Sequence, residues 1–139
     1  MRITALFFSN FQEKMNRNTF GKKEKLCSKL VIDKLFASGT SFKEFPIRVI
    51  YLSLENSDAT AKVLISVPKK RFGRSVSRNR IKRLLRETYR LNKSEIIENW
   101  QLRGKYFALA FVYIGNEMPE FNDLTVVMKR ILQKLNSVS

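Results

Sequence analysis

The sequence predicts a single α+β domain, and three observations support this. Its 139 residues suffice for one core of modest size and are too few for two comfortable ones. Hydrophobic residues make up 44% of the chain, with only 5 Gly and 3 Pro, which is typical of globular proteins and not of disordered ones. Segments with helical spacing alternate with segments rich in β-branched and aromatic residues. We therefore expect three helices and a sheet of three or four strands.

The N-terminal residues 1 to 18 are expected to form a disordered extension, so that the domain occupies residues 19 to 139. The apolar run from Ile3 to Phe8 is too short for a secretion signal and lacks a clear cleavage site. Met15 precedes a more regular basic stretch and is a candidate translation start, with residues 1 to 14 as an extension or artefact.

The first half of the domain predicts a helix followed by paired strands. Apolar residues from Leu26 to Phe36 predict a helix over Ser28 to Ala37, closed by Gly39 in a left-handed conformation. The segments Ile47 to Leu54 and Ala61 to Val67 are strand-like and are separated by a polar turn, which predicts an antiparallel hairpin. A further short strand between Phe42 and Leu54 would give the order αβββαβα. Without it the order is αββαβα.

The second half predicts two helices around a central strand. We expect a helix from Ser75 to Leu91, capped by Ser75 or Ser77, and a short helical continuation from Ser94 to Trp100. The almost wholly apolar stretch from Tyr106 to Ile114 suits a central strand. A final amphipathic helix, capped by Asn122 or Asp123, would bury Leu124, Val127, Met128, Ile131, Leu132 and Leu135.

Positive charge is concentrated in one segment. The chain has 27 Lys and Arg against 12 Asp and Glu, and 11 of the basic residues but only one acid lie between Lys69 and Lys93. At about 100° per residue, the basic side chains of the predicted helix fall on the side opposite Ile81, Leu84, Leu85 and Thr88. Such charge indicates a polyanionic partner. A membrane-surface helix would carry Trp or Phe on its apolar side, so we favour a nucleic acid and expect no membrane.

Several function classes are excluded by composition. The chain has no His, so histidine-based nucleophilic catalysis and His-ligated metals are excluded. Cys27 is the only cysteine, which excludes an intrachain disulfide and is consistent with the cytoplasm. The acids Glu95 with Glu98, and Glu117 with Glu120, form short local pairs typical of solvated charges, so catalysis by the protein alone is not expected.

The stretch from Arg78 to Arg86 resembles the motif R-N-x-x-K-R-x-x-R of the bacterial ribonuclease P protein subunit. Ser66 to Lys70 and Leu35 to Ser41 are similar to two further segments of that family. The resemblance implies an α+β fold with a mixed sheet of about four strands, three helices and a left-handed βαβ crossover, as in the second domain of a ribosomal protein. It also implies an endoribonuclease holoenzyme whose RNA subunit, with bound Mg²⁺, removes the 5′ leader of precursor tRNA.

The resemblance assigns two sets of binding residues and no catalytic or metal-binding residue. The set that contacts the catalytic RNA subunit comprises Lys69, Lys70, Arg74, Arg78, Asn79, Arg80, Lys82, Arg83, Arg86 and Arg90. A cleft beside the first helix would hold the single-stranded leader through Phe36, Ile32, and Ile50 or Tyr51, because strand alternation leaves open which of the last two faces the leader. The alternative function is a non-enzymatic RNA-binding protein, ribosomal or architectural.

Overall fold

A four-stranded mixed sheet forms the centre of the molecule. The computed structural model describes residues 20–138, so the expected N-terminal extension lies outside the described residues. The strands are β1 (Thr40–Glu44), β2 (Ile47–Leu54), β3 (Ala61–Ser66) and β4 (Tyr106–Tyr113), and their order across the sheet is β1-β2-β4-β3. The β1–β2 and β2–β4 pairs are antiparallel, whereas β3 and β4 are parallel.

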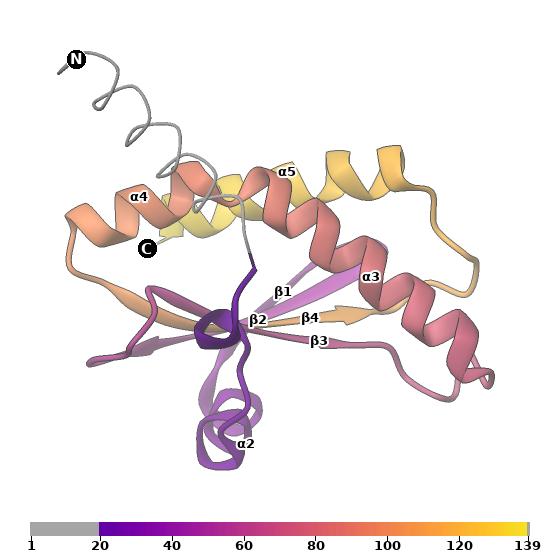
Figure 1. Ribbon diagram of the computed structural model, residues 1–139, viewed down its shortest axis with the longest axis horizontal. Helices are drawn as coiled ribbons and strands as arrows, with labels where there is room; N and C mark the ends of the chain where they lie inside the picture. Colours follow the sequence, from indigo (N-terminus) through magenta and orange to yellow (C-terminus); the bar gives the residue numbers. More distant parts are fainter. Residues whose placement is uncertain (1–19, 139) are drawn as a thin grey trace, which may run out of the picture.

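Four α-helices and one short 3-10 helix surround the sheet in the described chain. They are η1 (Lys22–Glu24), α2 (Lys29–Ser38), α3 (Ser75–Asn92), α4 (Ser94–Leu102) and α5 (Phe121–Val138). The helices α3, α4 and α5 cover one face of the sheet and α2 lies on the other (Figure 1). The expected count of three is exceeded because the predicted continuation after Ser94 is a separate helix, α4. None of these helices is both long and apolar enough to cross a bilayer.

The predicted hairpin between Ile47–Leu54 and Ala61–Val67 is wrong, because β4 lies between these two strands. Five consecutive residues of β4, from Phe107 to Phe111, are buried. A strand that is apolar on both faces is most stable in the middle of a sheet, where helices cover both sides. The stability gained by burying β4 between β2 and β3 therefore outweighs the local turn signal that predicted a hairpin.

The remaining expectations for the fold class are confirmed. The optional fourth strand exists as β1, which begins at Thr40 and pairs with β2, so the longer of the two predicted orders is correct. The parallel β3 and β4 are joined through α3 and α4, which makes the predicted βαβ crossover. The left hand of this crossover stays an expectation from the family resemblance.

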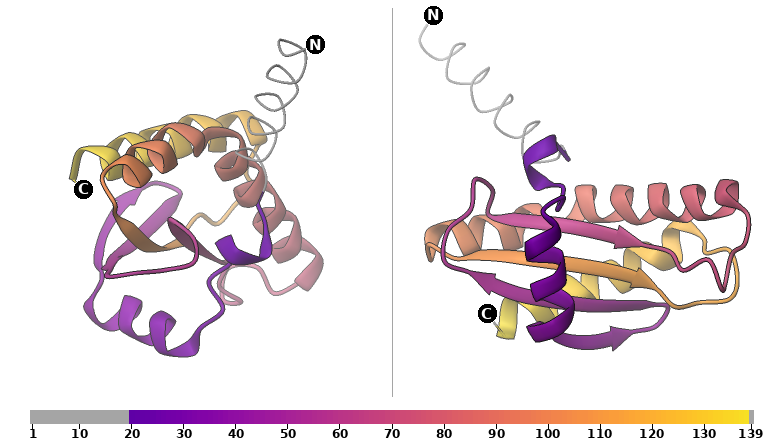
Figure 2. Two further views of the ribbon diagram at one scale, coloured as in Figure 1. Left: turned by 60° about the vertical axis from the view of Figure 1, so that its left-hand side comes forward. Right: turned by 90° about the horizontal axis from the view of Figure 1, so that it is seen from below.

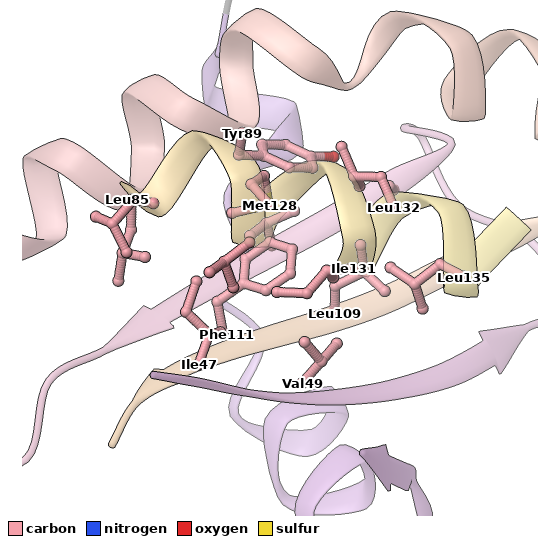
Figure 3. Packing of buried hydrophobic residues seen from close by; sticks show 14 of the residues in the cluster. Ile47, Val49, Leu85, Tyr89, Leu109, Phe111, Met128, Ile131, Leu132 and Leu135 are labelled. Atoms are coloured by element: carbon pink, nitrogen blue, oxygen red, sulfur yellow. The ribbon is translucent and has the colours of Figure 1, made fainter. Parts of the chain in front are cut away.

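The core has two parts, one on each side of the sheet. The larger lies between the sheet and α3, α4 and α5, where Leu85 and Tyr89 of α3 pack near Met128 of α5 and Phe111 of β4 (Figure 3). The smaller lies under α2 and contains Leu26, Leu35, Ile50, Ala108 and Ala110. Because α3 packs against the larger core, one of its sides faces inward and the opposite side is free for a partner.

The predicted local signals at helix ends are only partly correct. Gly39 follows α2 as expected, but its φ of −70° is not left-handed. Its missing side chain is required by space, because a Cβ there would lie 2.3 Å from the Leu35 carbonyl oxygen. Neither Ser75 nor Ser77 caps α3, whose N-cap is Arg74 without a side-chain hydrogen bond.

The final helix α5 begins at Phe121, so Asn122 and Asp123 lie in its first turn and are not caps as predicted. Asp123 still places a carboxylate where the helix dipole favours negative charge.

Candidate RNA interface

The helix α3 presents one side to the core and the opposite side to solvent. Ile81, Leu85, Thr88 and Tyr89 are buried, at the spacing of one helix face. Leu84, which we predicted on this face, is half-buried and packs against the core. This anchoring fixes the direction in which the basic side chains of α3 point.

The predicted RNA-contacting residues lie on this helix and on the loop before it. The exposed ones are Lys69, Lys70, Arg74, Asn79, Arg80, Arg83 and Arg86. Arg78, Lys82 and Arg90 are half-exposed. We define these ten residues as the cationic face. Arginine predominates in it, and its planar guanidinium pairs with two phosphate oxygens at once.

The single acid in this segment, Glu87, is bound by Arg90. Their carboxylate and guanidinium are 2.5 Å apart within one turn of α3. The hydrogen bond from Arg90 holds the pKa of the Glu87 carboxyl below its ordinary value, so that this carboxylate is charged at neutral pH. The charge of Arg90 is thus neutralised by Glu87. The residues of the cationic face that precede Glu87 are not paired with it.

Arg78 has a second task in addition to its charge, because it organises the loop that precedes α3. Its guanidinium donates hydrogen bonds to the carbonyl oxygens of Phe72 and Gly73, at 2.9 and 2.8 Å. The Arg71 and Phe72 amides in turn donate to the Pro68 carbonyl. The loop carrying Lys69, Lys70 and Arg74 is therefore held in one arrangement before any partner binds.

Arg71 belongs to this loop but was missing from the sequence-based set. It is exposed and donates a 2.7 Å hydrogen bond to Asn116 Oδ1, in the segment after β4. Phe72, beside it, packs against the core with its ring 5.8 Å from that of Tyr113. The only sequence signal for Arg71 was its place directly after Lys69 and Lys70, since its partner is 45 residues away.

The four residues predicted to bind a leader do not share one surface. Phe36 of α2 is half-exposed, and Ile32 packs partly against the smaller core. Ile50 faces α2 but is only 7% exposed, so it lies beneath the helix. Tyr51 points to the other side of the sheet, where its ring contacts Phe42. The alternation left open by the sequence is thus decided in favour of Ile50 for the α2 side.

The carboxylates of the described chain do not assemble into a metal centre. No group of three or more His, Cys, Asp or Glu side chains within residues 20–138 is arranged to hold a metal ion. Glu117 and Glu120 line a cavity of about 590 Å³ at the start of α5. What the arrangement offers chemically is dense, fixed positive charge for binding phosphates.

Comparison with known proteins identifies the family. The sequence profile of the family "Ribonuclease P" matches residues 20–136. The ribonuclease P protein component of Porphyromonas gingivalis is 41% identical over 120 residues, covering 84% of this chain and 88% of the relative. That of Chlorobium phaeobacteroides is 30% identical over 129 residues, covering 85% and 88%.

The fold is also shared with solved structures. The RNase P protein of Staphylococcus aureus superposes with a TM-score of 0.66 at 20% identity, covering 82% of this chain and 96% of that one. The RNase P protein from Thermotoga maritima gives a TM-score of 0.61 at 24% identity, covering 84% and 98%. The sequence motif, the fold and these relatives agree, and this chain belongs to the ribonuclease P protein family.

Proposed function

We propose that this chain is the protein subunit of ribonuclease P, an endoribonuclease that removes the 5′ leader of precursor tRNA. Catalysis would be carried by the RNA subunit, whose bound Mg²⁺ supplies the metal chemistry. This chain would bind the RNA subunit through the cationic face and the leader through the α2 side of the sheet. The enzyme would act in the cytoplasm, where its precursor tRNA substrate is made.

The observation that carries this proposal is the cationic face. Seven exposed Lys and Arg side chains lie on α3 and the loop before it, while the one acid of the segment is bound by Arg90. A protein keeps such self-repulsion when a polyanion relieves it. Fixed guanidinium groups can neutralise phosphates where RNA segments come close together, which favours a compact RNA fold and its bound metal ions.

Reconstitution tests the proposal. The chain is combined with a bacterial-type catalytic RNA, and cleavage of precursor tRNA is measured at low Mg²⁺. We expect cleavage that depends on the protein, and tighter binding of precursor than of mature tRNA. A non-enzymatic RNA-binding protein would bind RNA without either effect, so that result would overturn the proposal.

A matched pair of variants tests the cationic face itself. Arg80→Glu with Arg83→Glu reverses two exposed charges on α3, and Lys129→Glu with Arg130→Glu reverses two exposed charges on α5. We expect the α3 pair to abolish assembly with the RNA subunit at moderate salt and the α5 pair to weaken it far less. Equal losses would mean that only net charge matters and would remove the specific role of α3.

A further inference from the structure

Arg71 and Asn116 meet at the end of the sheet where β3 and β4 both finish. Figure 2 (right) shows the segments that follow these two parallel strands beginning at the same end of the sheet. The segment after β3 is residues 67–74, which we call the basic loop, and the segment after β4 leads to α5. Arg71 in the basic loop donates a 2.7 Å hydrogen bond to Asn116 Oδ1 in the segment after β4. This bond ties the two segments together.

The backbone of the basic loop is fixed on both sides of the Arg71 side chain. The Arg71 amide donates a hydrogen bond to the Pro68 carbonyl at 3.2 Å. The next residue, Phe72, is half-buried, and its ring lies 5.8 Å from that of Tyr113. The Phe72 carbonyl accepts a 2.9 Å hydrogen bond from Arg78. The fold therefore sets the position from which the Arg71 side chain extends.

Asn116 is fixed by its own segment as well. The buried Tyr113 donates a 2.6 Å hydrogen bond from its hydroxyl to the Glu117 carbonyl. Gly115 passes so close to the tyrosine ring that an added Cβ would lie 2.7 Å from Tyr113 Oη, and it would also lie 3.0 Å from Pro46 Cβ. The chain on either side of Asn116 is therefore held in place, and its side-chain amide stands at a defined position beside the basic loop.

The partner of Arg71 carries no charge, in contrast to that of Arg90. Glu87 neutralises the charge of Arg90, whereas an amide oxygen orients a guanidinium and leaves its charge intact. The ion pairs within residues 20–138 do not involve Arg71. The bond to Asn116 uses one N–H group, and the rest of the guanidinium fork stays open to an anion. Arg71, which is exposed, therefore presents a full positive charge in a fixed orientation.

We propose that Arg71 binds a backbone phosphate of the RNA subunit and that Asn116 is its positioning residue. This assignment rests on the proposed function and adds one contact to the cationic face. Arg71 directly follows Lys69 and Lys70 on the basic loop, so an RNA strand bound to these lysines passes within its reach. A side chain that is oriented before binding loses less conformational entropy when it meets a phosphate. The hydrogen bond from Asn116 therefore increases affinity although Asn116 itself does not contact the RNA.

The test measures the affinity of the full chain for a bacterial-type catalytic RNA over a series of salt concentrations. The main variant is Asn116→Asp, which changes an amide into a carboxylate of the same shape. It should strengthen the bond to Arg71 and cancel its charge, so that RNA binding weakens while the Tm stays unchanged or rises. We expect affinity to fall about tenfold, and the slope of log affinity against log salt to fall by about one. Arg71→Ala should lower the slope by the same amount.

Two further variants separate charge from orientation. Asn56→Asp makes the same change in net charge at an exposed residue between β2 and β3. Because β2 runs antiparallel to β4, this turn lies at the opposite end of the sheet, and the control should leave the slope unchanged. Asn116→Ala keeps the charge of Arg71 but frees its side chain. Affinity should then fall about threefold at an unchanged slope.

A double-mutant cycle separates positioning from direct repulsion of the RNA. If Asn116 acts through Arg71, Asn116→Asp should have little further effect in the Arg71→Ala background. An equal loss in both backgrounds would mean that the new carboxylate repels the RNA itself, which would overturn the role of Asn116. A wild-type salt slope in Arg71→Ala would remove Arg71 from the interface, even where the wild-type protein supports cleavage. A wild-type protein that does not assemble with the catalytic RNA would overturn the proposed function as well.

Discussion

Lys93, between α3 and α4, forms an ion pair with Glu24 of η1, 69 residues away in sequence. The Lys93 side chain is 3% exposed and that of Glu24 is 23% exposed. The rings of Phe20 and Tyr89 each lie 5.8 Å from the Lys93 ammonium. This basic residue therefore faces the interior and not the solvent, although it belongs to the basic segment. It fixes the start of the domain against the end of α3.

Breaking this pair should destabilise the protein. Glu24→Gln removes the carboxylate that pairs with the buried Lys93, and we expect a loss of about 2 kcal/mol in the free energy of unfolding. This is less than the about 3 to 5 kcal/mol typical of fully buried pairs, because Glu24 is partly solvated. Urea unfolding measures it, with Glu95→Gln at an exposed position as control. A loss no larger than that of the control would contradict the role of the pair.

We expect removal of the Tyr89 hydroxyl to increase the stability of the folded protein. This group is buried and has no hydrogen-bond partner in the described chain, and burial raises the pKa of Tyr89. Tyr89→Phe should therefore be neutral or stabilising by up to about 1 kcal/mol at pH 7. Tyr113→Phe is the matched comparison, since the Tyr113 hydroxyl donates to the Glu117 carbonyl at 2.6 Å. It should cost about 1 kcal/mol.

The same tyrosine predicts a loss of stability at alkaline pH. Its folded-state pKa is raised above the ordinary phenol value of about 10, so above that pH the unfolded chain releases a proton that the folded chain retains. This difference in pKa leaves the free energy of unfolding unchanged below about pH 10 and lowers it as the pH rises further. Tyr89→Phe should reduce the slope of stability against pH above 10. An unchanged slope in unfolding experiments would show that Tyr89 does not limit alkaline stability.

The turn from α2 into β1 has no room for a side chain at Gly39. A Cβ at this position would lie 2.3 Å from the Leu35 carbonyl oxygen and 2.8 Å from Ile50 Cγ2. Gly39→Ala should cost about 2 to 3 kcal/mol in the free energy of unfolding. Gly73→Ala is the control, because no atom lies within 4 Å of its added Cβ. Similar effects of the two substitutions would contradict the close approach at Gly39.

Arg86 and Arg78 test the contribution of single charges to RNA binding. Neutralising either should lower the slope of log affinity against log salt by about one, because one phosphate contact is lost. Arg86→Ala should leave the fold intact, since Arg86 is exposed on α3. Arg78→Ala should also free the Phe72 and Gly73 carbonyls and expose the loop to hydrogen exchange. An unchanged slope for either variant would remove that residue from the interface.

Helical periodicity was sufficient to place the cationic face, because it depends on neighbours in sequence. The spacing of Ile81, Leu85 and Thr88 fixed which side of α3 is buried, and the structure confirms it. The motif from Arg78 to Arg86 was likewise enough to indicate the family, and the comparisons confirm that membership. Both signals lie within about three turns of one helix, where geometry follows directly from residue spacing.

Long-range pairing could not be predicted in the same way. Two strand-like segments joined by a turn predicted a hairpin, yet the apolar β4, which follows them by some forty residues, separates them. The side of the sheet taken by Ile50 and Tyr51, and the facing positions of Lys43 and Arg48, depend on strand register and on α2 covering one face. Alternation gives two equivalent solutions until packing selects one.

The amino-acid sequence by itself determined the α+β class, the boundaries of the main helices to within a few residues, and the amphipathic basic helix with its family. Only the tertiary structure decided that β4 is central, that Lys93 is buried against Glu24, and that Arg78 holds its own loop. The physical reason is that local periodicity reports burial along one element. Partners far apart in sequence are selected by the total apolar area that the assembled layers can bury.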